Sequence, residues 1–186
     1  MGLIFVTSNP RKVVEANKIA RAFGVELQQQ ILDIDEIQSD SPEKVVIAKA
    51  KSAYEILKQP VVVNDTSWSI PALNGFPGAY MKDVMHWFTP YDWLNLIKNY
   101  DDKSITAIEH VAYCDGEVKT FGVEIPGHFA NEPRGKGGNS IERVVYFSDG
   151  KTISERHGGI GGYENSVLGA LGHWEQFFEW YLENMK

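Results

Sequence analysis

The first residues that could do chemistry lie near the start of the chain, in the segment Thr7-Ser8-Asn9-Pro10-Arg11-Lys12. An apolar run at residues 3–6 precedes them, which predicts a turn from a buried strand into a helix. Free backbone N–H groups and the helix dipole favour anions at such a turn. Thr7, Ser8 and Asn9 add side-chain donors, and Lys12 adds a positive charge one turn into the helix. The pattern indicates a phosphate site; the alternative is a capped helix with a surface pair between Lys12 and Glu15.

Two acidic segments could bind a metal ion or activate water. Asp33, Asp35 and Glu36 follow a predicted strand at residues 25–32, and clustered carboxylates are ligands that Mg²⁺ accepts. A solvated acidic turn is the alternative for this segment. Asp65 follows the buried-strand run Val61-Val62-Val63, at the end of the strand where α/β folds place functional groups. A simple turn or cap residue is the alternative for Asp65.

Two glycine-rich segments lie at residues 134–140 and 158–162. Either could cradle phosphates or form a mobile lid, but neither has the spacing of a P-loop or of a dinucleotide-binding turn. We therefore interpret both as flexible loops. A third loop, at residues 72–78, requires unusual backbone angles at a glycine.

The elements that position these residues alternate between strand and helix. The pattern predicts strands at residues 3–6, 25–32, 61–63 and 144–147, a hairpin of residues 105–114 and 118–125, and helices after Pro10, Ser41-Pro42 and Pro90, with a final helix from Asn165 or Ser166. We expect an α/β fold with some parallel pairing, in which a two-lobed mixed sheet is flanked by helices. The hairpin suggests a β-rich second lobe, and a cleft between the lobes is the expected active site.

Composition excludes several classes of protein. The chain has 186 residues, of which 43% are hydrophobic and 23% charged, enough for a folded core without an obvious domain boundary. A net charge of −7 with no run of basic residues argues against a nucleic-acid binder. The single cysteine, Cys114, excludes an intrachain disulfide. We find neither a signal peptide nor an apolar run near the ~20 residues of a membrane span, so we expect a cytoplasmic protein that does not act at membranes.

Several of these segments, taken in order, resemble motifs of the inosine/xanthosine-triphosphate pyrophosphatases, the Ham1-like family. Thr7-Ser8-Asn9-x-x-Lys12-x-x-Glu15 is similar to T-x-N-x-x-K-x-x-E, and Glu36-Ile37-Gln38 to E-I-Q. Ala48-Lys49-Ala50 resembles the family's K-A helix. Asp65-Thr66 falls on the second Asp and the Ser of D-D-S-G-L, and residues 72–78 match A-L-x-G-x-P-G.

The resemblance implies one Ham1-like domain over residues 1–186, a homodimer, and cleavage of a nucleoside triphosphate to the monophosphate and pyrophosphate. By position, Glu36 and Asp65 would bind Mg²⁺ (or Mn²⁺), and Asp65 would activate the attacking water. Lys12 and Lys49 would neutralise the charge of the phosphates, and Lys12 would also be a catalytic residue. Thr7, Ser8, Asn9 and Thr66 would position the substrate.

Departures from the family pattern concentrate on the side that reads the base. The F-G-Y-D motif falls on Asn139-Ser140-Ile141-Glu142, so Asn139 and Glu142 become the candidate base contacts. The S-H-R motif falls near residues 165–167 and the preceding lid Lys near Gly161, and neither is retained. Trp68, His157 and Tyr163 are candidate replacements, with packing or loop roles as the alternative. The first Asp of D-D-S-G-L is Asn64 here.

We therefore predict a hydrolase whose base preference has shifted from inosine and xanthosine, because a site without hydrogen-bonding partners for a base discriminates poorly for it. The alternative is a non-catalytic nucleotide-binding or regulatory protein on the same fold, which Asn64 and the missing His-Arg pair would explain.

Overall fold

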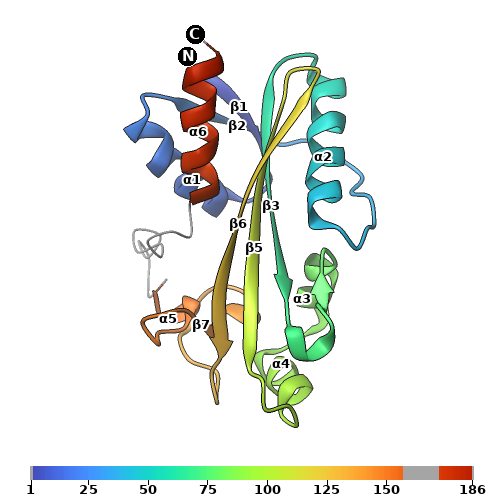
Figure 1. Ribbon diagram of the computed structural model, residues 1–186, viewed down its shortest axis with the longest axis vertical. Coiled ribbons are helices and arrows are strands. Elements are labelled where there is room, and N and C mark those ends of the chain that lie inside the picture. The colour runs from blue at the N-terminus through green and yellow to red at the C-terminus, as the bar shows by residue number, and fades with distance from the viewer. Residues whose placement is uncertain (1, 157–171, 186) are drawn as a thin grey trace. The chain divides into compact units, whose positions relative to one another are not determined.

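The computed structural model describes residues 2–156 and 172–185 and has a mixed α/β fold (Figure 1). Its elements in chain order are β1 (Gly2–Val6), α1 (Pro10–Ala22), β2 (Glu26–Gln30), α2 (Pro42–Leu57), β3 (Val61–Ser69), η1 (Pro71–Leu73), β4 (Pro77–Gly78), α3 (Met81–Trp87), α4 (Pro90–Ile97), β5 (Ser104–Cys114), β6 (Val118–Phe129), η2 (Ile141–Arg143), β7 (Val145–Tyr146), α5 (Ile153–Arg156) and α6 (Gly172–Asn184).

The sheet mixes parallel and antiparallel pairs, as the sequence predicts. Its hydrogen-bonded order is β2-β1-β3-β5-β6-β7, with β4 paired to β3. Strand β1 pairs in parallel with β2 and β3, with Ile4 opposite Val61 and Val6 opposite Val63. Strands β4 and β7 pair antiparallel with β3 and β6. Strands β1 and β3 therefore run the same way, with Thr7 directly after β1. Asp65 lies inside β3, which continues to Ser69 instead of ending at residue 63 as the sequence predicts.

The chain divides into two compact units. The first comprises residues 1–66, 109–123 and 168–186, and the second comprises residues 67–108 and 124–167. The division differs from the expected β-rich lobe in two ways. The turn half of the β5–β6 hairpin belongs to the first unit, and the second unit contains α3, α4 and α5 beside its strands. The expected cleft between the two lobes stays a prediction.

The core of the first unit forms on both faces of its strands. Because side chains alternate along a strand, Val62 packs with α1 and α6, whereas Val61 and Val63 pack with α2. Figure 1 shows α1 and α6 on one side of these strands and α2 on the other. Phe5 meets Trp174 edge to face at 5.1 Å between ring centroids, which ties β1 to α6. Strand β3 is thereby held on both faces up to the residue before Asn64.

The second unit has its own core, formed mostly by aromatic and β-branched side chains. Fully buried Trp93 and Ile105 lie at its centre, and Trp68 stacks on Phe147 at 6.4 Å. Trp68 is 6% exposed and packs in this core, which is the role given as the alternative for it.

Cap residues begin the helices where the sequence predicts. Asn9 accepts a hydrogen bond from the backbone N–H of Arg11 and begins α1, and Ser41 accepts one from Lys44 N–H and begins α2. The second strand is shorter than expected, Glu26–Gln30 instead of residues 25–32. The predicted start of the last helix lies outside the described residues.

Candidate phosphate and metal site

The turn between β1 and α1 combines a helix cap with exposed donors. Thr7 is buried, and its Oγ1 accepts a hydrogen bond from Asn9 N at 3.1 Å. Asn9 Oδ1 accepts a hydrogen bond from Arg11 N at 2.9 Å, so this oxygen caps the helix. The side-chain amide nitrogen of Asn9 can then donate to a ligand. Ser8 and Asn9 are exposed. The helix is thus capped, and the side chains of Ser8 and Asn9 are open to solvent.

Lys12 is half-buried. Its Nζ donates to the backbone oxygen of Asn64 at 3.4 Å, which joins α1 to the middle of β3. Burial lowers the pKa of Lys12, and the nearby carboxylates Glu109 and Asp65 oppose that change. On the same part of the helix, Arg11 and Glu15 form an ion pair at 3.8 Å. A half-buried ammonium at a helix start is a local attractor for an anion.

Glu36 and Asp65 converge on a single ammonium group. Lys49 Nζ, on α2, lies 2.8 Å from Glu36 Oε1 and 3.9 Å from Asp65 Oδ1. The three side chains are between 18% and 31% exposed, so they are open to a small ligand. Burial raises the pKa of Asp65, while Lys12 and Lys49 act in the opposite direction. Asp33 and Asp35, by contrast, are exposed on the loop, as the solvated-turn alternative predicts.

The donor set at Glu36 and Asp65 fits Mg²⁺. The two carboxylates already share one cationic group, and Mg²⁺ is commonly bound by one or two carboxylates, waters and substrate phosphates. Residues 2–156 and 172–185 contain no cluster of three or more acidic, His or Cys side chains that could form a complete metal cage. Substrate oxygens would therefore have to complete the coordination.

A second polar cluster beside this site was missed by the sequence analysis. Glu109 on β5 accepts a hydrogen bond from Thr66 Oγ1 at 2.8 Å and from Asn64 Nδ2 at 3.4 Å. Asn64 Nδ2 also lies 2.9 Å from the backbone oxygen of His110 and 3.3 Å from His173 Nε2. Burial raises the pKa of Glu109 to about 7 and lowers that of His173 to about 3. A glutamate within the mostly apolar run of residues 105–114 was the available signal, because proteins rarely bury unpaired charges.

The candidate base contacts belong to the second unit. Glu142 is buried, and its Oε2 accepts a hydrogen bond from Asn139 N at 2.9 Å. Gly138, with φ of +80°, lies so close that a Cβ there would be 1.8 Å from Glu142 Oε2. Glu142 and the backbone of Asn139 therefore form one constrained loop. His157, Tyr163, Gly161 and residues 165–167 lie outside the described residues.

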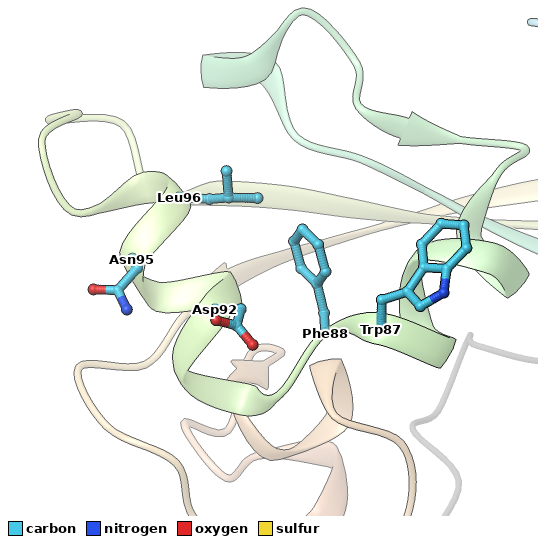
Figure 2. A pocket seen from close by; sticks show the side chains of 5 residues that line it. All are labelled: Trp87, Phe88, Asp92, Asn95 and Leu96. Carbon is cyan, nitrogen blue, oxygen red and sulfur yellow. The ribbon is translucent and has the colours of Figure 1, made fainter.

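The second unit has a hollow beside α3 and α4, lined by none of the candidate site residues. Figure 2 shows its lining side chains, and its volume is about 450 Å³. The residues that line it are Trp87, Phe88, Asp92, Asn95 and Leu96. Its carboxylate, Asp92, caps α4 by accepting hydrogen bonds from Thr89, so it is committed to the helix. We assign no chemistry to this hollow.

Within the described ranges, no helix is long and apolar enough to cross a membrane.

Comparisons with known proteins show the family and agree with the fold. A model of the Ham1 family matches residues 3–157. The dITP/XTP pyrophosphatase of Methanopyrus kandleri is 35% identical over 193 residues, covering 100% of this chain and 98% of that protein. The dITP/XTP pyrophosphatase of Thermococcus kodakarensis is 32% identical, with 100% of both chains covered. The structure of a HAM1 protein from Coxiella burnetii superposes with a TM-score of 0.80 at 22% identity, over 98% of this chain and 99% of the other.

Proposed function

Because the chain belongs to the Ham1 family, we propose that it hydrolyses a nucleoside or deoxynucleoside triphosphate to the monophosphate and pyrophosphate. It is a nucleotide pyrophosphatase, a hydrolase of phosphoric anhydrides. The observation that carries the finer proposal is the pair of carboxylates, Glu36 and Asp65, beside two lysines, Lys12 and Lys49. Such an arrangement suits charge neutralisation and alignment, which dominate catalysis of phosphoryl-type displacement.

Each side chain has a distinct task in this proposal. Lys12 and the donors of Thr7, Ser8 and Asn9 bind phosphate oxygens at the start of α1. Asp65 accepts a proton from the water that attacks the α-phosphorus, as the bond from that phosphorus to the bridging oxygen breaks and pyrophosphate leaves. Burial raises the pKa of Asp65, which makes its carboxylate a stronger base. Lys49 keeps Asp65 and Glu36 in place between turnovers.

Glu36 and Asp65 are the proposed ligands of Mg²⁺, with Mn²⁺ as a substitute. Bound metal would neutralise negative charge on the triphosphate and on the departing pyrophosphate. Removal of divalent cations with a chelator should abolish pyrophosphate release, and added Mg²⁺ should restore it.

The proposed shift in base preference rests on the second unit. Asn139 and Glu142 stand where the resemblance places the base-reading motif, and the aromatic residue of that motif is absent. Glu142 is buried and its Oε2 accepts a hydrogen bond from the N–H of Asn139, and its carboxylate is the acceptor that we propose for a base. A carboxylate of this kind selects bases that present donors.

A nucleotide panel tests the activity and the base preference together. Pyrophosphate release would be measured with Mg²⁺ on dITP, XTP, the standard nucleotides and modified pyrimidine and purine triphosphates. We expect turnover, with the highest kcat/KM on a nucleotide other than dITP or XTP. Highest efficiency on dITP or XTP would refute the shift and keep the hydrolase. Nucleotide binding without turnover of any member would favour the non-catalytic alternative.

Asp65→Asn is the matched test of the site. We expect kcat to fall by at least about 100-fold, because the variant lacks the proton acceptor. Folding should change little, since the amide is nearly isosteric and burial already disfavours the charged form. Asp33→Asn, an exposed residue of the neighbouring loop, is the control and should retain full activity.

A homodimer, a cytoplasmic location and a single functional domain are further parts of the proposal, which rest on the resemblance. Sedimentation of the purified chain should give twice the mass of the 20.9 kDa monomer. A monomeric mass at micromolar concentration would refute the dimer.

A further inference from the structure

Glu109 is a half-buried carboxylate that the proposed mechanism does not use. Its side chain is 19% exposed, and one oxygen, Oε2, receives hydrogen bonds from both Thr66 and Asn64 on the neighbouring strand. His173 Nε2, on α6, lies 4.0 Å from the same oxygen. Burying a carboxylate is costly unless its partners compensate, so this arrangement needs an explanation.

The charge that faces Glu109 is the phosphate-binding lysine. Among the surrounding charges, Glu109 contributes the largest effect that favours the protonated form of Lys12, ahead of Asp65. Lys12 Nζ also donates to the backbone oxygen of Asn64, while the side chain of Asn64 donates to Glu109. Lys12 and Glu109 are therefore both held by the same residue of β3.

Asn64 suits this environment because its amide nitrogen faces two oxygens, Glu109 Oε2 and the backbone oxygen of His110, which can accept its two hydrogens. His173 Nε2 lies 3.3 Å from the same nitrogen and accepts a hydrogen bond in the tautomer that is protonated on Nδ1. An aspartate at position 64 would point a second carboxylate oxygen at those two oxygens. The D-D-S-G-L motif has an acid at this position, and here the acid lies across the sheet on β5.

We propose that Glu109 is a positioning residue of the pyrophosphatase site: from β5 it supplies the carboxylate that position 64 lacks, orients Lys12 toward the triphosphate and fixes the hydroxyl group of Thr66. The inference rests on the proposed function. It explains Asn64 by a carboxylate that lies on β5 instead of β3, and not by the loss of that carboxylate.

One consequence concerns Thr66. Its hydroxyl hydrogen is donated to Glu109 at 2.8 Å, so toward the substrate the hydroxyl oxygen is an acceptor. Thr66 then suits a water molecule or a sugar hydroxyl better than a phosphate oxygen. This role differs from the donor role that the resemblance implies for Thr66.

An exchange of the two side chains tests the proposal. Three variants are compared with the wild type: Glu109→Gln, Asn64→Asp, and the double variant N64D/E109Q, which returns the carboxylate to β3 and places the amide on β5. Glu117→Gln, exposed at the turn of the same hairpin, is the control. Pyrophosphate release gives kcat and KM, and thermal melting reports folding.

We expect Glu109→Gln to lower kcat/KM by about 10- to 100-fold, as small misplacement of a binding group does. Asn64→Asp should lose activity too, because two carboxylates then face one another. The double variant should recover at least about tenfold over either single variant. Full activity of Glu109→Gln would overturn the proposal, and so would a double variant no better than the worse single one.

Two readouts do not depend on turnover. The side-chain amide signal of Asn64, identified by its loss in Asn64→Asp, should move in the NMR spectrum of Glu109→Gln and stay unchanged in Glu117→Gln. Calorimetric binding of inorganic tripolyphosphate with Mg²⁺ should weaken in Glu109→Gln by a similar factor. If the wild type hydrolyses no nucleotide but these shifts are seen, the proposed function fails and the positioning role stands. If turnover is present and neither readout responds, the positioning role fails instead.

Discussion

At the residue scale, Lys49 occupies the position between two carboxylates that the proposed Mg²⁺ would also approach. Replacing it by Met leaves Glu36 and Asp65 without their shared cation, which should lower the free energy of unfolding by about 1 kcal/mol in chelator. Added Mg²⁺ should restore this loss, because an ion that binds the folded state stabilises it.

Melting temperature with and without Mg²⁺ measures this effect. Lys51→Met, on the exposed side of the same helix, should respond to Mg²⁺ as the wild type does. An equal Mg²⁺ response in both variants would contradict the assignment of Glu36 and Asp65 as ligands.

Glu109 gives a second prediction, on stability as a function of pH. Burial raises its pKa from 4.5 to about 7, so between these values the folded state keeps a proton that the unfolded state has released. The contribution of Glu109 to the free energy of unfolding is complete below 4.5, the pKa of the unfolded state, and is lost as the pH rises through 7. Lys12 and Glu15 on α1 and His173 on α6 face Glu109, and all three stay the same in Glu109→Gln.

Urea denaturation without Mg²⁺ or nucleotide tests this at pH 4.5 and pH 8. The wild type should lose up to about 3 kcal/mol relative to Glu109→Gln over that range. Parallel stability curves for the two proteins would show that the Glu109 carboxyl is not perturbed.

The sequence yields a candidate residue where the signal lies close to it in the chain. Thr7 and Asp65 became candidates because each follows an apolar run, at residues 3–6 and 61–63, and their roles stay predictions. Glu109 was missed because its partners, Asn64 and Thr66, are more than 40 residues away and meet it only through the pairing of β3 with β5. Strand order is a property of the sheet, and local periodicity does not specify it.

At the element scale, the loop that carries Glu142 depends on two adjacent glycines in different ways. A Cβ at Gly138 would collide with Glu142 Oε2 and would require a φ of +80°, whereas a Cβ at Gly137 meets nothing within 4 Å. Gly138→Ala should therefore displace Glu142 and raise KM for the preferred nucleotide by about tenfold or more. Gly137→Ala is the matched control and should leave KM unchanged. Similar kinetics of the two variants would remove Glu142 from the base site.

Helix α2 gives a prediction about stability instead of specificity. Ser41 caps it by accepting a hydrogen bond from Lys44 N at 3.3 Å, and Pro42 occupies the first turn. Ser41→Ala should lower the free energy of unfolding by about 1 kcal/mol, because a backbone donor of the first turn loses its partner. Ser52→Ala, in the middle of the same helix, should be neutral or slightly stabilising. Denaturant titration of both variants decides whether the cap has this effect.

These caps also explain which elements were predictable. Asn9, Ser41 and the residues around Pro90 are local signals, and the helices begin where they indicate. Helix α3 was not predicted, because Met81–Trp87 has neither a side-chain cap nor a proline at its start. Its position follows from packing of Met81 and Val84 into the core of the second unit, which is a tertiary effect.

At the scale of the whole molecule, β3, β5 and β6 each contribute residues to both compact units. A strand that loses its packing in one unit cannot keep its hydrogen bonds unchanged where it continues into the other. We therefore expect one cooperative unfolding transition.

Phe177→Ala, in the core of the first unit, and Ile105→Ala, in that of the second, should each lower the free energy of unfolding by about 2–5 kcal/mol, because both side chains are fully buried. Tryptophan fluorescence and far-ultraviolet circular dichroism should give coincident curves for each variant. Ile31→Ala, at a side chain that is 62% exposed, should change the free energy of unfolding by less than about 0.5 kcal/mol. If one core variant instead split the transition into two steps, the units would be independent folding domains, and the continuous strands would not couple them.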